Sequence, residues 1–154
     1  MTLYDRDFHA WAEEQAALAR TRSGNALDWD NVAEELESLG RRERQELRSR
    51  YVILIQHLLK WLHQADGRTS SWRKTIRVQR KDIARHMREN PSLRAHDDRL
   101  FGEAHETARL EAAEETGLPE RIFTEQPPFT PEQARDEAFW PETGSPAAEG
   151  RHDR

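Results

Sequence analysis

Residues Tyr51 to Leu62 are the stretch of this sequence that most constrains the fold. Apolar side chains occur on every side of a helical wheel drawn through them, so other elements must cover the helix all round. The stretch also contains Gln56, His57 and Lys60, and it is shorter than the roughly 20 apolar residues needed to cross a bilayer. It therefore predicts the central helix of a bundle and no membrane span.

An apolar stripe extends this central helix towards the N-terminus and predicts one helix from Asp28 to the Asp66-Gly67 stop. Gly40 either breaks or bends that helix. Because the stripe keeps its angular phase across Gly40, we expect a continuous, bent helix of about 39 residues, close to 58 Å long. The residues of the stripe before Gly40 that are expected to face inward are Trp29, Val32, Leu36 and Leu39.

Amphipathic stripes predict three further main helices, at about residues 5–22, 69–90 and 90–117. The first of these helices spans only about 25 Å, so it is too short to cover the long helix of about 58 Å. The uncovered length of the long helix needs another element or a second chain, and this is the sequence argument for a homodimer. Asp97 lies within the apolar stripe of the last main helix and therefore needs a partner, for which Arg80 is the expected residue.

The C-terminal part predicts an extended arm laid across the bundle. Thr130 and Gln133 form a capping box with Pro131 at the first helical position, so a short helix is expected to open there and to end before Trp140. Residues 143–154 are small and polar and are expected to be disordered. The predicted organisation is one all-α domain over residues 1–142: four main helices in a bundle around a long central second helix, with the arm and the short terminal helix.

Charge is distributed unevenly along the chain, whose formal net charge is −5. Residues 1–40 carry nine acids and three bases, residues 41–88 carry fourteen bases and four acids, and residues 89–154 carry sixteen acids and seven bases. We expect the basic middle to pair with the acidic flanks within the folded chain, with presentation to a partner as the alternative. The acidic group Glu34-Glu35-Glu37 is expected to be a solvated face or to contact the basic helix.

The predicted helix over residues 69–90 has a strongly basic face, which forms the candidate phosphate- or partner-binding surface. Its members are Arg73, Lys74, Arg77, Arg80, Lys81, Arg85 and Arg88. Such a row of cations is typical of nucleic-acid binding. Against that function, no aromatic residue is interleaved with the cations, the chain is acidic overall, and no helix-turn-helix spacing is present.

The histidines give no recognisable catalytic or metal-binding motif. His57, His86, His96 and His105 have no acidic residue three positions before them in the manner of di-iron bundles, and no metal or cofactor is predicted. His57 is the best single candidate for a functional histidine, with a hydrogen-bonded core histidine as the favoured alternative. The pairs Arg80/His86 and Arg99/His105 are similar to the Arg-x4–6-His pattern of one class of helical ribonucleases, which keeps a hydrolase or nuclease hypothesis open.

The sequence also predicts where the protein resides. Its N-terminus is acidic and aromatic, unlike a signal peptide, and it contains no cysteine. We therefore expect a cytoplasmic protein without disulfides or thiol chemistry.

Several ordered motifs resemble the bacterial domain of unknown function 29 family. They are Leu3-Tyr4-Asp5, Trp11, residues 33–40 (AEELESLG), residues 57–61 (HLLKW), Ser71-Trp72-Arg73, Thr75-Ile76, Gln79-Arg80, Pro91-Ser92-Leu93 and residues 113–119 (AEETGLP). The resemblance covers roughly residues 3–142. It implies an all-helical bacterial domain, and it implies no reaction, cofactor or catalytic residue.

The function is thus unknown from the sequence. The favoured hypothesis is a non-catalytic, cytoplasmic protein-interaction or regulatory module, because clean amphipathic stripes leave no convergent polar site. The alternatives are a nucleic-acid-binding protein that uses the basic helix, and a hydrolase or nuclease that uses His57, His86 or His105 with nearby charges.

Overall fold

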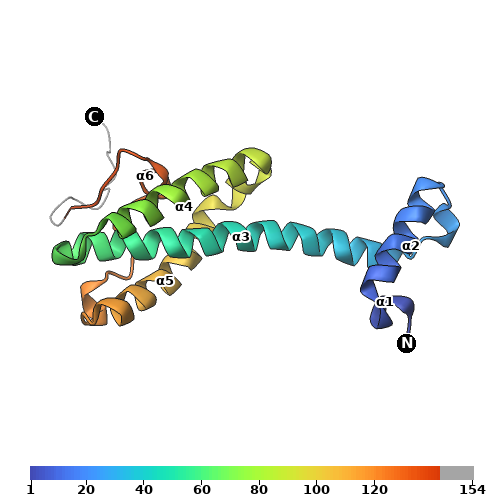
Figure 1. The fold of residues 1–154 in the computed structure, drawn as a ribbon, viewed down its shortest axis with the longest axis horizontal. Helices are drawn as coiled ribbons and strands as arrows, with labels where there is room; N and C mark the ends of the chain where they lie inside the picture. The colour runs from blue at the N-terminus through green and yellow to red at the C-terminus, as the bar shows by residue number, and fades with distance from the viewer. Residues whose placement is uncertain (143–154) are drawn as a thin grey trace. The chain divides into compact units, whose positions relative to one another are not determined.

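The computed structural model describes residues 1–142, and the tail expected to be disordered, residues 143–154, lies outside the described part. The all-α prediction is confirmed, because every regular element of residues 1–142 is an α-helix or a 3-10 helix (Figure 1). No helix in that part of the chain is long and apolar enough to span a bilayer.

The long helix α3 runs without interruption from Trp29–His63, through Gly40. The expectation of a continuous helix is therefore confirmed. The chain divides into two compact units, Met1–Arg42 and Glu43–Arg154, where the sequence analysis expected a single bundle. The first part of α3 belongs to the first unit and the remainder to the second.

In the first unit, the helix expected over residues 5–22 is divided into two. Helix α1 is Leu3–Arg6 and helix α2 is Phe8–Arg20, and a 3-10 helix, η1, follows at Gly24–Ala26. Asp7 separates the two α-helices because its side chain accepts a hydrogen bond from the backbone N–H of Ala10 and so caps α2.

The first unit has a small core around Trp11. This indole is 5% exposed and packs edge-on against Tyr4, with ring centroids 4.8 Å apart. Its Nε1 donates to the Asp28 carboxylate at 3.0 Å, and the Tyr4 hydroxyl donates to Glu35 at 2.5 Å. Helices α1 and α2 are thereby attached to the beginning of α3.

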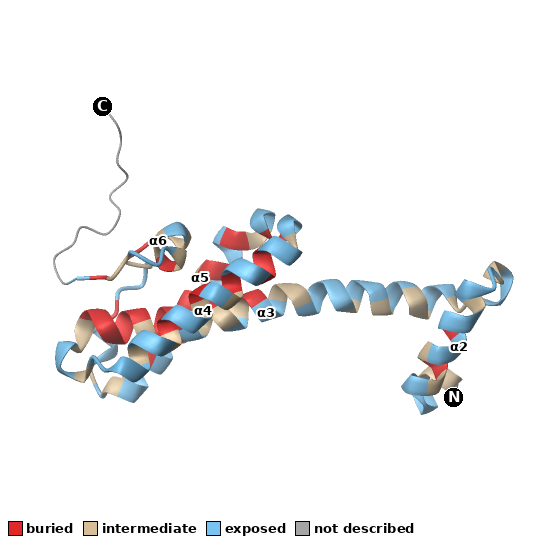
Figure 2. Ribbon diagram, turned by 45° about the horizontal axis from the view of Figure 1, so that its top comes forward, coloured by how far each residue is buried: buried red, intermediate tan, exposed pale blue. Residues whose placement is uncertain are grey.

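The second unit is a helical bundle built on the second part of α3. Its further elements are η2 (Ala65–Gly67), α4 (Ser70–Glu89), η3 (Pro91–His96), α5 (Asp97–Thr116), η4 (Glu120–Ile122) and α6 (Pro131–Arg135). Helices α4 and α5 lie along α3 (Figure 1), and the buried residues gather where these three helices meet (Figure 2). The central stretch predicted from Tyr51 to Leu62 supplies most of the buried residues of α3.

The helix ends of this unit follow the predicted signals with two exceptions. Gly117 ends α5 with a φ of 72°, a left-handed conformation that favours glycine, and Thr130 forms the expected capping box with Gln133. The first exception is Pro91–His96, which is a 3-10 helix instead of the first turns of α5. The second is the end of α3 at His63, before the predicted Asp66-Gly67 stop, which lies in the 3-10 helix η2.

A buried polar cluster joins α3, α5 and α6. Asp97 is 6% exposed and accepts hydrogen bonds from the Tyr51 hydroxyl, at 2.5 Å, and from the Arg135 guanidinium. Arg135 also donates to the Tyr51 oxygen at 2.7 Å. The prediction that Asp97 needs a partner is confirmed, but Arg80 as that partner is wrong, because Arg135 comes from the short terminal helix.

Candidate functional site

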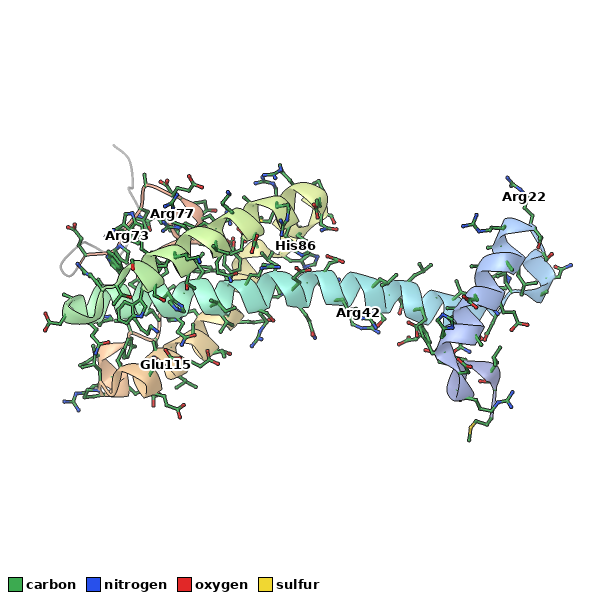
Figure 3. The ribbon with its side chains drawn as sticks, in the orientation of Figure 1. Arg22, Arg42, Arg73, Arg77, His86 and Glu115 are labelled. Carbon is green, nitrogen blue, oxygen red and sulfur yellow. The ribbon has the colours of Figure 1, made fainter. Side chains whose placement is uncertain are left out.

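Helix α4 carries the predicted basic face on its exposed side. We call Arg73, Lys74, Arg77, Lys81, Arg85 and Arg88 the basic surface; all six are exposed. Two shallow hollows of about 360 and 420 Å³ open on it. Both hollows are lined by Val78 and Lys81, and Val78 is 42% exposed between the cations. The labels of Arg73 and Arg77 in Figure 3 mark the beginning of this surface.

Most cations of the basic surface have no carboxylate partner among residues 1–142. Asp82 forms ion pairs of 3.2 Å with Arg85 and with Arg50 of α3. Within residues 1–142, no carboxylate lies within ion-pair distance of Lys74, Arg77, Lys81 or Arg88. The expected pairing of the basic middle with the acidic flanks therefore does not neutralise this part of α4.

Arg80 does not belong to the basic surface, which corrects the sequence analysis. It is 2% exposed, and it donates to the backbone oxygens of Ala134 and Phe139, each at 2.7 Å. Arg80 thus attaches the C-terminal arm to α4. The spacing contained the signal for this burial, because Arg80 lies four residues after Ile76 and three before Ile83 on the apolar side of the helix.

Aromatic rings approach the basic surface in space although they do not alternate with its cations in sequence. The Trp61 and Trp140 rings pack with their centroids 4.6 Å apart. The guanidinium groups of Arg68 and Arg73 lie 5.0 and 5.6 Å from the Trp61 ring, within cation–π range. The surface around the N-terminal end of α4, which begins at Ser70, therefore combines aromatic ring faces with positive charge.

His57 does not meet a carboxylate. Its Nδ1 lies 2.8 Å from the backbone oxygen of Ile53, one turn earlier in α3, and must donate to it. Burial, foremost among several influences, lowers the pKa of His57. The nearby Glu115 is bound by Lys60 at 2.7 Å. His57 thus fits the alternative of a hydrogen-bonded histidine at the edge of the core.

A histidine and two carboxylates converge between α3 and α4. The histidine is His86, which is labelled in Figure 3. The His86 Nε2 lies 2.9 Å from the Glu43 backbone oxygen and 3.4 Å from the Glu43 carboxylate, and Nδ1 lies 3.6 Å from Glu46. One ligand atom from each residue lies within 4.8 Å of the others, as a metal site requires. However, Nε2 is occupied by the carbonyl and Glu46 is also bound by Arg50 at 3.0 Å, so the contacts serve to hold α4 on α3.

The two Arg/His pairs of the nuclease hypothesis are not brought together. Arg80 is turned towards the C-terminal arm and His86 towards α3. Arg99 binds Glu103 at 3.2 Å, whereas His105 is 1% exposed and its Nε2 has no hydrogen-bond partner in the described part of the chain. Neither pair forms a joint acid–base site.

A second feature, which the sequence analysis assigned to the core, lies on the surface of the first unit. Three large apolar residues of the first part of α3 are exposed: Trp29 by 61%, Leu36 by 63% and Leu39 by 50%. Val32, between them, is half-buried. The predicted inward orientation is wrong for Trp29, Leu36 and Leu39, because no other element of residues 1–142 covers this part of the amphipathic stripe (Figure 2). We call these four residues the α3 stripe.

The fold and its surfaces define an all-helical protein with an apolar stripe in one unit and a basic helix surface in the other. The chain belongs to the family described as domain of unknown function DUF29, whose model matches residues 3–140. This match confirms the resemblance seen in the motifs. Comparison with curated proteins and with solved structures gave no match in either case.

Proposed function

We propose that this protein is a non-catalytic, cytoplasmic protein-interaction or regulatory module, and that the α3 stripe is its interacting surface. The supporting observation is the exposure of Trp29, Leu36 and Leu39 on one helix face. Soluble proteins rarely expose contiguous large apolar side chains unless they serve as an interaction site. The remaining polar groups support this proposal, since His86 and Arg80 hold elements of the fold together and His57 binds a carbonyl of its own helix.

The proposal is tested by chemical cross-linking of the tagged chain in cells of its native host. The variant Leu36→Glu with Leu39→Glu should lose its cross-linked partner, because two charges would enter a desolvated interface. Leu110→Glu is the matched control, since Leu110 of α5 is 51% exposed and lies outside the stripe. The same cross-linked products in both variants would contradict the proposal.

Nucleic-acid binding by the basic surface is the second candidate. Its supporting observation is the set of cations, among them Arg77 and Lys81, that have no carboxylate partner in the described part of the chain. The variant Arg77→Glu with Lys81→Glu should weaken binding to a labelled oligonucleotide and lower the slope of log affinity against log salt by roughly 2.

The matched control for this second candidate is Arg94→Glu with Arg121→Glu, which changes the net charge equally at exposed positions outside α4. Fluorescence anisotropy at several salt concentrations measures both variants. An equal loss of affinity in the two variants would assign the effect to net charge and would reject a defined binding surface.

A further inference from the structure

The α3 stripe has the spacing of a coiled-coil seam. Trp29, Val32, Leu36 and Leu39 are separated by three, four and three residues, which corresponds to two successive a and d pairs. Ala33 and Gly40 lie beside this seam, seven residues apart, and both are exposed. Because they are small, they would allow a second helix to approach closely. The seam thus has the form of one half of a helix pair.

The charges along the same helix segment are arranged asymmetrically. The residues from 28 to 37 contain five acids and no base: Asp28, Asp30, Glu34, Glu35 and Glu37. Arg41 and Arg42 follow. Two such segments side by side in the same direction would place acids opposite acids. In opposite directions, the acidic part of each helix faces the basic part of the other, which is favourable.

We infer that Leu36 and Leu39 of the α3 stripe bind the same two residues of a second copy of this chain, with the two α3 helices antiparallel. This inference rests on the proposed function and names its partner. A two-fold axis between Leu36 and Leu39 makes Leu36 of each copy face Leu39 of the other, and Glu34 face Arg41. Val32 and Trp29 then lie opposite Glu43 and Glu46 of the other copy, outside the apolar centre of the contact.

The reason for a second copy instead of an unrelated helix is this self-complementarity. A two-fold interface requires that when one residue meets another, the reciprocal contact also exists. The apolar pair Leu36/Leu39 and the charged pair Glu34/Arg41 meet that requirement about the same axis. Within one chain Glu34 and Arg41 already form a half-exposed ion pair of 3.1 Å, so the dimer joins two such pairs into one group of four charges.

Sedimentation of the purified full chain over a range of concentrations tests the inference. The chain should form a dimer, and Leu36→Glu with Leu39→Glu should raise the dissociation constant at least about a hundredfold. Leu110→Glu should leave it unchanged. Circular dichroism verifies that each variant is folded, which is expected because the replaced side chains are largely exposed.

A charge exchange tests the pairing of opposite charges. Glu34→Lys with Glu37→Lys, and separately Arg41→Glu with Arg42→Glu, should each weaken the homodimer. An equimolar mixture of the two variants should form a heterodimer, because opposite charges then face each other between positions 34 and 41 on both sides of the axis. Failure of the mixture to associate more tightly than either variant alone would overturn the inference.

Spin labels test the antiparallel direction, and the absence of cysteine makes single attachment sites straightforward. Asp30→Cys and Glu37→Cys are exposed and lie one heptad apart on the same face. In the antiparallel dimer, the two labels at position 37 lie close to the two-fold axis and to each other. The two labels at position 30 are separated by about 22 Å along the direction of the helices. Equal distances at both positions would indicate a parallel pair and overturn the inference.

The outcomes separate this inference from the proposed function. A chain that stays monomeric when pure, while the stripe variant still loses a cross-linked partner in cells, would overturn self-pairing and leave the interaction module standing. A dimer that the stripe variant does not weaken would overturn the inference by placing the contact elsewhere. A monomer with no stripe-dependent partner would overturn both.

Discussion

Lowering the pH should destabilise the protein through His105. This imidazole is 1% exposed, and burial, followed by the charge of Arg109, lowers its pKa to about 4, against about 6.5 in an unfolded chain. Between these two values the unfolded chain binds a proton that the folded protein does not. The free energy of unfolding is therefore greatest above about pH 6.5, falls as the pH decreases to about 4, and loses nothing further from this residue below that.

The size of the effect follows from the same two pKa values. Their difference corresponds to an upper limit of roughly 3 kcal/mol at about 1.4 kcal/mol per pH unit. Urea unfolding, followed by tryptophan fluorescence at pH 7 and pH 4.5, measures it in the wild type and in His105→Leu. The loss between the two pH values should be smaller by about 2 kcal/mol in the variant.

Comparison of the two chains isolates His105, because every other titrating group is common to both. These groups include His57 and His63, whose pKa values burial also lowers. An identical loss of stability in the wild type and in His105→Leu would refute the argument.

The remaining predictions concern the stability of the second unit and are measured by urea unfolding. Arg135→Met should cost about 3–5 kcal/mol because Asp97 is left buried without its cation, whereas adding Asp97→Leu should recover much of that loss; equal losses would contradict it. Gly67→Ala should cost about 1–3 kcal/mol, since a Cβ there would lie 2.6 Å from the Trp72 ring. Gly117→Ala should cost about 1 kcal/mol because of the left-handed backbone at the end of α5; an unchanged midpoint would refute either glycine argument.

The helices were largely predictable because their signals are local. The constant angular phase across Gly40 correctly indicated one long helix, and Gly117 and Thr130 marked ends that the structure confirms. The break at Asp7 was missed, although aspartate is a common N-cap residue. Capping competes with helix continuation there, and periodicity alone does not decide between them.

The exposure of the α3 stripe could not be predicted from its pattern. Amphipathic spacing shows that a face is suited to burial, but it contains no information about which element, if any, covers that face. Leu47 and Leu36 have nearly the same angular position on the α3 helical wheel, yet Leu47 is fully buried and Leu36 is 63% exposed. The difference arises from the tertiary packing of the second unit around Leu47.

Polar partners distant in the sequence were the least predictable part of the candidate sites. The partner of Asp97 proved to be Arg135, 38 residues away, and the acceptors for Arg80 are backbone carbonyls at 54 and 59 residues. Backbone acceptors exist at every residue, so the sequence gives no means of selecting among them. Only the path of the C-terminal arm determines these pairs.

The attachment of that arm has a consequence for how the protein is made. Arg80 donates to the backbone oxygens of Ala134 and Phe139, and Arg135 donates to Tyr51 and Asp97. Phe123 and Phe129 of the same arm are buried in the core. During translation, Tyr51, Arg80 and Asp97 are therefore synthesised long before the residues of the arm that bind them. The second unit completes its folding only after the ribosome has synthesised the chain through Phe139, long after α3 and α4 have been made.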